Sequence, residues 1–263
     1  MINSLAIGSF DAIHLAHQEL IKRADGVLVI EHHRATITPG YKRSNYTKKA
    51  TFFYLLEDIK HLSPQEFIKK LTHDFPALKK IVVGYDFRFG KNAKGDIRTL
   101  QELFHGDVEI VDEIKIDNIS VHSRVIRTLI KESNITLANK LLGRNYKIDG
   151  EQIRGLGLGS KKLVPTINLK VQNYTLPEGV FISNTFIDKN CYPSLSFLGK
   201  RLSVNNSFSI ETHILTNFTI KKYSNIEIEF LETLRENRKF NSLVELKEQI
   251  EQDRYRAKIY HKL

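Results

Sequence analysis

Short apolar runs alternate up to Arg144 with segments whose apolar positions recur at helical spacing. The runs predict strands buried on both faces, and they lie at residues 2–7, 27–30, 80–84 and 108–111. The segments expected to be helical lie at residues 20–24, 48–61, 64–71, 97–104 and 136–142. The segment 48–61 is assigned to a helix from the spacing of Phe52, Leu55 and Ile59. This alternation predicts a doubly wound α/β fold with a parallel sheet.

Polar residues that can cap a helix mark where several of these segments begin. Ser63 is followed by Pro64 and, three positions after the serine, by Glu66, which is the pattern of a capping box with proline in the first turn. Asp96 stands in a cap position before the apolar stripe of residues 97–104. Ser242 is expected to begin a final helix with Leu243, Leu246 and Ile250 on one face.

The pattern changes after Arg144 to short runs of alternating apolar residues. Six strands are predicted at residues 146–148, 166–169, 180–186, 192–197, 208–215 and 226–231. Six strands joined by glycine- and asparagine-bearing turns suggest an antiparallel β-barrel, closed off by the helix that starts at Ser242. We therefore predict an N-terminal domain over residues 1–142 and a C-terminal domain over residues 143–263.

Composition narrows the setting and the class of ligand. Cys191 is the one cysteine among 263 residues, which excludes an intramolecular disulfide and a thiolate metal cluster. The N-terminus lacks the layout of a signal peptide and no run is long enough to span a membrane, so we expect a cytoplasmic protein with no membrane partner. The net charge is +10, but the basic residues are dispersed, which favours small phosphorylated ligands over nucleic acid. The sequence leaves open whether the protein forms a homo-oligomer.

The segment Gly8–His17 joins the first strand to the first helix. Gly8 breaks the strand, and His14 and His17 then stand three residues apart where a helix begins, which places both imidazoles on one face. A helix N-terminus after a parallel strand can bind an anion, and two imidazoles there suit a phosphate whose charge grows during a reaction. On spacing alone, a polar helix start with two solvated histidines is an equal alternative.

The same segment carries a resemblance to a known family. The pattern G-x-F-D-x-x-H-x-x-H resembles the HxGH signature of the nucleotidylyltransferases, and the string GSFDAIHLAHQEL is similar to the opening of prokaryotic bifunctional riboflavin kinase/FAD synthetases. Ala12 and Ala16 stand where that family usually has glycine. The resemblance implies a Rossmann-like nucleotidylyltransferase domain, with catalytic His14 and His17. It also implies nucleotide- or phosphate-binding roles for Gly8, Phe10 and Asp11.

A second segment follows the predicted strand at residues 80–84. It resembles the family's G-x-D-F-R-F-G-x-x-x-x-G-D, and it supplies glycines, aromatic rings and cations where an α/β sheet presents ligands. The resemblance implies that Asp86 and Arg88 contact the nucleotide and that Phe87 and Phe89 contact the flavin. A flexible basic surface loop is the alternative.

At the end of the predicted strand at residues 27–30 the match to the family is poor. No role is therefore predicted for the histidines at 32 and 33, which are expected to be solvated.

A third segment, Ile119–Arg127, resembles the family's ISSTRIR at a helix N-terminus. Ser123 and Arg127 then correspond to the phosphate-binding serine and arginine, since a hydroxyl and a guanidinium at a helix start can bind phosphate oxygens. His122 replaces the first serine, and Arg124 stands one residue before the family's first arginine. Whether Arg124 or Arg127 reaches the phosphates stays open.

In the C-terminal half, residues 155–169 resemble the flavokinase glycine loop and its PTAN motif. The resemblance implies that Gly155, Gly159 and Lys161 bind the nucleotide, and that Thr166 and Asn168 hold Mg²⁺ with it. Hydroxyl and amide oxygens suit this ion. The family's G-R-x-L-G-F is replaced here by residues 159–164, in which Ser160 stands at the position of the arginine.

Two further matches complete the second half. The string Glu211-Thr212-His213 resembles the family's E-x-H, in which the glutamate is the general base, while a solvent-facing strand residue is the alternative. Arg235 lies in a match to the closing FLxxLRxxxKF, which implies a flavin contact. Residues 199–203 match the family's G-T-R-P-T more weakly.

Together the motifs imply an enzyme that makes two flavin cofactors. It would phosphorylate riboflavin with ATP to give FMN, and then transfer AMP from ATP to FMN to give FAD and pyrophosphate, with Mg²⁺ as the metal. Two alternatives remain, namely an enzyme in which one activity is live, and a basic nucleic-acid-binding protein on a retired enzyme scaffold.

Overall fold

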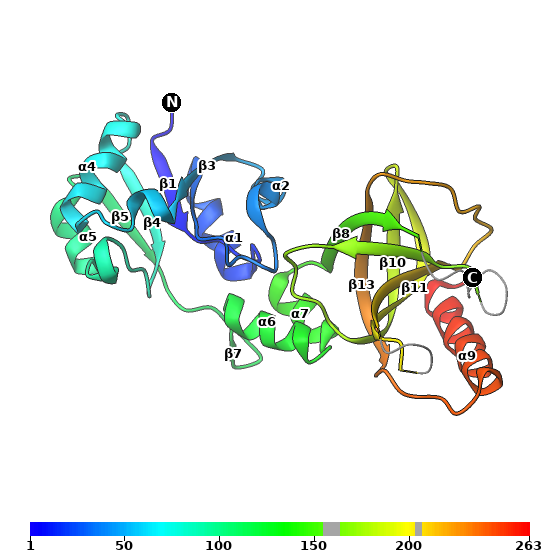
Figure 1. Ribbon diagram of the computed structural model, residues 1–263. Coiled ribbons are helices and arrows are strands. Elements are labelled where there is room, and N and C mark those ends of the chain that lie inside the picture. The colour runs from blue at the N-terminus through cyan, green and yellow to red at the C-terminus, as the bar shows by residue number, and fades with distance from the viewer. Residues whose placement is uncertain (155–163, 203–206) are drawn as a thin grey trace. The chain divides into compact units, whose positions relative to one another are not determined.

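The computed structural model describes residues 1–154, 164–202 and 207–263 (Figure 1). The chain divides into two compact units, Met1–Ile126 and Arg127–Leu263. This division falls inside helix α6 (Ser123–Lys131). The boundary predicted between residues 142 and 143 lies at the end of helix α7 (Ile135–Leu142), just before the first barrel strand.

The first unit is built on a five-stranded parallel sheet with the order β3-β2-β1-β4-β5. Its strands are β1 (Ser4–Gly8), β2 (Gly26–Glu31), β3 (Ala50–Leu55), β4 (Lys80–Gly84) and β5 (Asp107–Val111). Its other elements are α1 (Leu15–Lys22), η1 (Gly40–Arg43), α2 (Ser44–Thr47), α3 (Leu56–Ile59), α4 (Pro64–Asp74), η2 (Lys91–Ala93), α5 (Ile97–Leu103), β6 (Lys115–Ile116) and β7 (Ile119–Ser120). The α/β fold with a parallel sheet is thus confirmed.

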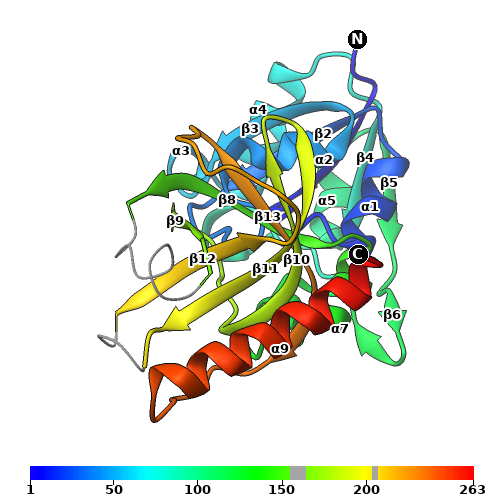
Figure 2. The same cartoon turned by 90° about the vertical axis from the view of Figure 1, so that its right-hand side faces the viewer.

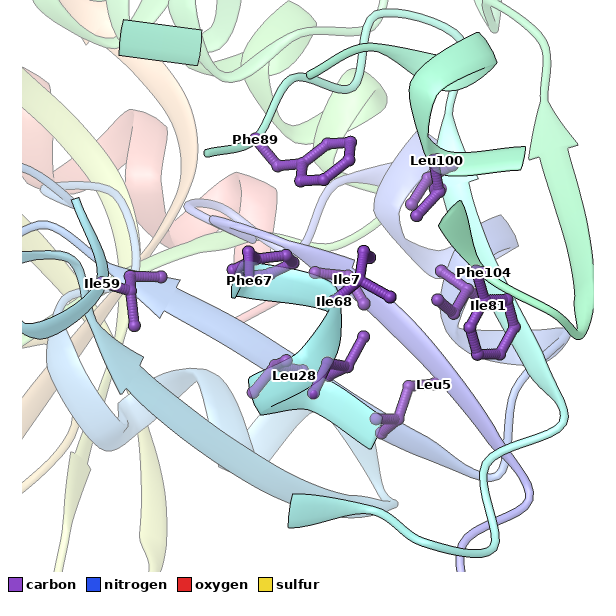
Figure 3. Close-up of a cluster of buried hydrophobic side chains, with 12 residues drawn as sticks. Leu5, Ile7, Leu28, Ile59, Phe67, Ile68, Ile81, Phe89, Leu100 and Phe104 are labelled. Atoms are coloured by element: carbon purple, nitrogen blue, oxygen red, sulfur yellow. The ribbon is translucent and has the colours of Figure 1, made fainter. Parts of the chain in front are cut away.

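Both faces of this sheet are covered, which explains why its central strands are apolar throughout. Leu5 and Ile7 of β1 belong to a core shared with α4 and α5, to which Phe67 and Leu100 contribute (Figure 3). The alternate residues of β1 and β2 pack with α1 on the other face. The capping box of Ser63 and Glu66 and the cap at Asp96 begin α4 and α5 as predicted.

The helix predicted over residues 48–61 is wrong. Residues 50–55 instead form β3, which pairs in parallel with β2 along its whole length, and helix α3 is confined to Leu56–Ile59. Phe52 and Tyr54 pack against the core, whereas Phe53 and Leu55 are exposed, which is the alternation of an edge strand. The aromatic run favours a strand, and this preference overrides the helical spacing.

The second unit contains a closed six-stranded barrel with the order β10-β11-β12-β9-β8-β13 (Figure 2). Its elements are β8 (Tyr146–Ile153), β9 (Ile167–Val171), β10 (Gly179–Ile187), β11 (Asn190–Lys200), β12 (Phe208–Ile214), β13 (Ile226–Arg235) and α9 (Leu243–His261). Every pairing in the barrel is antiparallel. The predicted barrel with a terminal helix is confirmed.

Part of the barrel interior is polar. Five hydroxyl groups, all completely buried, form a closed ring of hydrogen bonds of 2.7–3.0 Å. They belong to Ser183, Thr185, Ser194, Ser196 and Thr212, on strands β10, β11 and β12. Because each hydroxyl can donate one bond and accept one from its neighbours, the ring satisfies all five donors without water.

Helix α9 is fixed to the barrel mainly through its middle and end. It contacts β11 (Figure 2). Its Ala257 is completely buried in an apolar cluster with residues of β10, β11 and β13. The buried carboxylate of Asp253 accepts hydrogen bonds from Arg235 Nε at 2.9 Å and from Gln249 at 2.8 Å. Leu243, expected on one face with Leu246 and Ile250, is 51% exposed, so the buried face of the helix does not begin in its first turn.

Candidate active sites

The turn between β1 and α1 has an unusual backbone. Phe10, Ala12 and Ile13 all have positive φ values, of 52°, 82° and 45°. Side chains rarely adopt this conformation, so the turn must be stabilised by its surroundings. All three of these residues are buried, with at most 1% of their surface exposed.

Three side chains hold this turn through its backbone and its neighbours. The Asp11 carboxylate accepts hydrogen bonds from the backbone N–H groups of residues 36, 37 and 38, at 2.9–3.2 Å. The completely buried Arg43 donates to the Ser9 carbonyl oxygen at 2.6 Å and pairs with Glu31. Ser123 Oγ donates to the Asp11 carbonyl oxygen at 2.7 Å. The turn is therefore tied to the loop between β2 and η1 and to the start of α6.

The two histidines of the turn are stacked on each other. His14 caps α1, and its Nδ1 accepts a hydrogen bond from the His17 backbone N–H at 3.2 Å. The ring centroids are 3.6 Å apart with an interplanar angle of 12°, and the rings of Phe10 and His17 form a T-shaped contact with a centroid distance of 5.1 Å. Burial, followed by the neighbouring charges of His14, His122 and Arg43, lowers the pKa of His17 well below its usual range. His17 is therefore neutral at pH 7.

A pocket of about 760 Å³ opens beside these rings at the carboxyl ends of the strands. The predicted residues that line it are Gly8, His14, His17, Asp86, Phe87, Arg88 and Ser123. The lining residues that the sequence gave no role include Ser9, His32, Tyr85 and His122. Arg124, one of the two arginines considered for the phosphates, also lines the pocket. His32, for which no role was predicted, is half-buried and lines this pocket. The Tyr85 hydroxyl lies 2.9 Å from His122 Nε2, which joins two of the motif segments.

Four predicted residues of this half have other surroundings. Phe10 and Asp11 are buried in the turn and support it, as described above. Phe89 belongs to the hydrophobic core and packs on Phe67 at 5.5 Å (Figure 3). Arg127 belongs to the second unit, whereas Arg124 is exposed and lines the pocket of the first.

The second cluster of predicted residues lies on neighbouring strands of the barrel. Glu211 of β12 pairs with Asn168 of β9 in the antiparallel register. Thr166 Oγ1 donates to Glu211 Oε2 at 3.0 Å, and Ser209 Oγ donates to Glu211 Oε1 at 3.0 Å. Arg201 donates from Nε to Glu211 Oε1 at 2.8 Å and from Nη2 to Asn168 Oδ1 at 2.8 Å. Thr166, Asn168 and Glu211 are thus brought together as predicted, and Arg201 links two of them.

His213, two residues after Glu211 on β12, contacts the segment that precedes Thr166. Its Nδ1 lies 2.8 Å from the Pro165 carbonyl oxygen, so Nδ1–H donates and the segment before Thr166 is fixed. Burial lowers the pKa of His213, which keeps the imidazole neutral at pH 7. Its Nε2 is buried and has no hydrogen-bond partner among the described residues. Gly155, Gly159 and Lys161 lie outside the described residues.

Comparison with known proteins assigns the two halves. A family model described as riboflavin kinase matches residues 142–261, and one described as FAD synthetase matches residues 27–125. A bifunctional riboflavin kinase/FMN adenylyltransferase of Buchnera aphidicola (subsp. Acyrthosiphon pisum) is 30% identical, over 95% of this chain and 90% of its own. This chain belongs to the family of bifunctional riboflavin kinase/FMN adenylyltransferases.

Two more relatives extend this picture. The riboflavin kinase/FMN adenylyltransferase of Bacillus subtilis is 28% identical, over 96% of this chain and 90% of its own. A crystal structure titled as a macrolide-efflux protein from Streptococcus pneumoniae aligns with a TM-score of 0.83, at 25% identity, over 95% of this chain and 92% of its own. In the part of this chain that the structure describes, we find no helix of the length and hydropathy needed to span a membrane.

The oxygen donors around Glu211 fit Mg²⁺ only as part of its coordination shell. Among the described residues, no group of three or more His, Cys, Asp or Glu side chains could hold a metal by itself. Thr166 Oγ1 and Asn168 Oδ1 are hard, neutral oxygen donors beside a carboxylate, which fits Mg²⁺ provided that phosphate oxygens and water complete its shell. This donor set therefore fits a metal that arrives with a nucleotide.

Arg235 is the last predicted residue of the second unit. Its guanidinium pairs with Asp253 of α9 and lies over the Phe240 ring at 5.7 Å. These contacts position α9, and a role in flavin binding stays a prediction. Arg201 is the contact that sequence reasoning missed, although the weak match at residues 199–203 placed an arginine there.

Proposed function

We propose that this protein phosphorylates riboflavin with ATP to give FMN, and then adenylylates FMN with a second ATP to give FAD and pyrophosphate. The observation that carries the proposal is the presence of one preassembled polar cluster in each of the two units. Each cluster has the residue types that one of the two reactions needs, and each unit corresponds to one of the two family models. Cys191, as the single cysteine, supports a cytoplasmic setting.

In the kinase reaction, Glu211 would accept the proton of the ribityl hydroxyl as its oxygen attacks the γ-phosphorus of ATP. Three hydrogen bonds from Thr166, Ser209 and Arg201 hold this carboxylate in one orientation, which is what a general base requires. Mg²⁺ bound with the nucleotide would neutralise phosphate charge, and Thr166 and Asn168 would provide its protein ligands.

In the adenylyl reaction, a phosphate oxygen of FMN would attack the α-phosphorus of ATP and pyrophosphate would leave, so no protein nucleophile is needed. His14 and His17 lie at the start of α1, beside the pocket, where they would donate hydrogen bonds to the negative charge that develops on the oxygens of the α-phosphate. Because His14 Nδ1 accepts a backbone hydrogen bond, Nε2 is the ring nitrogen of His14 that can donate. Ser123 and either Arg124 or Arg127 would hold the departing phosphates.

A product assay tests this proposal directly. Riboflavin, ATP and Mg²⁺ are expected to give FMN first and FAD later, and FMN with ATP is expected to give FAD and pyrophosphate. FAD formation from FMN without FMN formation from riboflavin, or the reverse, would establish the single-activity alternative. Turnover of neither flavin, with salt-dependent binding of RNA or DNA, would favour the nucleic-acid-binding alternative.

A further inference from the structure

Arg201 donates hydrogen bonds to Glu211 and Asn168, two residues that the proposed kinase reaction needs. It follows β11 directly, and its side chain is 16% exposed. One guanidinium spans a carboxylate on β12 and an amide on β9, through Nε to Glu211 and Nη2 to Asn168, both at 2.8 Å. The planar fork of arginine suits such a double contact, which the point charge of a lysine cannot reproduce.

The contact with Asn168 has a consequence for metal binding. The Asn168 oxygen that accepts from Arg201 is the same atom that would coordinate a divalent cation. A cation bound there would lie within a few ångströms of the guanidinium, and like charges at that separation repel. The cation and the guanidinium therefore compete for this oxygen.

The contact of Arg201 with Glu211, unlike its contact with Asn168, is expected to favour turnover. Glu211 Oε1 receives Arg201 and Ser209, whereas Oε2 receives Thr166. Loss of the guanidinium would leave the carboxylate with hydroxyl donors in this group of contacts, and a rotating carboxylate is a poorer general base. The same side chain thus opposes the metal and orients the base.

We propose that Arg201 is a positioning residue that takes the place of the divalent cation when no nucleotide is bound. It holds Glu211 and Asn168 in register, and it leaves the Asn168 oxygen, while keeping Glu211, when Mg²⁺–nucleotide binds. The inference rests on the proposed kinase function of this site.

The test compares Arg201→Gln and Arg201→Lys with Arg256→Gln, a matched control at an exposed arginine on α9. Binding of Mg²⁺–ADP and of ADP without metal is measured by titration calorimetry. Because the adenylyl site is unchanged in all variants, a difference between variants reports the kinase site. Rates of FMN formation, and of FAD formation from supplied FMN, are measured on the same preparations.

Arg201→Gln is expected to bind Mg²⁺–ADP at least about fivefold more tightly, with a smaller change for metal-free ADP. Its kcat for FMN formation is expected to fall by about 10- to 100-fold, while FAD formation is unchanged. Arg201→Lys should fall between wild type and Arg201→Gln in both measurements, and it carries the same test if the glutamine variant does not fold. Arg256→Gln should match wild type.

Weaker or unchanged Mg²⁺–ADP binding in the Arg201 variants would overturn the proposal, because a merely structural arginine, or one that binds phosphate, gives that result. Failure of the proposed function looks different. In that case the wild-type protein itself forms no FMN, whatever the binding of Mg²⁺–ADP to the variants.

Discussion

The two candidate sites are held together by different kinds of contact. In the first unit, side chains bond to backbone groups at a turn. Asp11, which lies in the turn, accepts from the N–H groups of residues 36–38, and Arg43 donates to the Ser9 carbonyl oxygen. In the second unit, side chains hold other side chains, as Arg201 does with Glu211 and Asn168. The histidines are placed by the conformation of the chain, whereas the glutamate is placed by its partners.

This difference sets where each site is sensitive. A turn with positive φ at three side-chain-bearing residues persists only while its surroundings over-determine it. Substitutions that leave the histidines intact, but free the turn, should therefore damage the adenylyl site. A cluster of directly bonded side chains responds instead to changes of charge and hydrogen-bonding capacity within the cluster.

The strongest test of the comparison is a reciprocal pair of substitutions. We expect His17→Ala to lower FAD formation from FMN by about 10²- to 10³-fold, because a donor aimed at the developing charge is lost. FMN formation should be unchanged. Glu211→Gln should lower FMN formation by a similar factor, because the base is lost, and should leave FAD formation unchanged. Separate rate assays of the two steps measure both effects.

The control is the folded state of each variant, which circular dichroism melting checks. If either substitution abolished both activities in a protein that is still folded, the assignment of one reaction to each unit would be wrong.

The next largest effect is expected for Asp11→Ala, which leaves the N–H groups of residues 36–38 without their acceptor. An unpaired buried donor costs about 1–3 kcal/mol, so the free energy of unfolding should fall by about 2–3 kcal/mol. FAD formation should fall with it, since the turn carries both histidines. Asp25→Ala is the matched control, because Asp25 accepts from the backbone N–H groups of Asn3 and Ser4 at the opposite end of β1.

Asp25→Ala should lower the free energy of unfolding by less than Asp11→Ala does, because Asp25 is exposed, and it should leave the FAD-forming rate unchanged. Equal rate losses in the two variants would show that general stability, and not the anchoring of the turn, limits the adenylyl site. Chemical denaturation and the FMN-to-FAD assay decide between these outcomes.

Much of this arrangement could be predicted from local sequence. Ser63, Glu66 and Asp96 begin helices because a cap depends on residues within one turn. The pairing of Asn168 with Glu211 follows from two strand motifs that share a barrel. Local spacing misled at residues 50–55, where pairing with β2 decides for a strand.

The remaining features depend on contacts between distant segments. His32 lines the pocket because β2 ends beside β1, which no local pattern reveals. The weak motif match at residues 199–203 contained Arg201, but its bond to Asn168 joins residues 33 positions apart. Asp11 belongs to the strongest motif, yet its carboxylate accepts hydrogen bonds from the loop between β2 and η1, so the motif predicted the residue without its contacts.

A smaller effect should show whether side-chain bonding also supports the core of the second unit. Ser183→Ala opens the ring of five hydroxyls and leaves its two neighbours, Ser194 and Ser196, each short of one partner. We expect a loss of about 1–2 kcal/mol in the free energy of unfolding, with both activities kept. Ser224→Ala, at an exposed position, is the control and should change stability by less than about 0.5 kcal/mol. A Ser183→Ala protein as stable as this control would mean that the ring contributes nothing.

The smallest expected effect tests the backbone of the turn itself. Ala12 has a φ of 82°, which glycine adopts without steric cost, so Ala12→Gly relieves about 1–2 kcal/mol of strain. It also removes a buried methyl group, worth about 0.8 kcal/mol, and adds about 0.5–1 kcal/mol of freedom to the unfolded chain. These contributions nearly cancel, and the change in unfolding free energy should stay within about 0.5 kcal/mol of zero. Ala16→Gly is the matched control inside α1, where no strain is relieved and a loss of about 1 kcal/mol is expected. Equal losses in the two variants, measured by chemical denaturation, would mean that the turn stores no strain at Ala12, and that its anchors at Asp11 and Arg43 hold a conformation the chain already prefers.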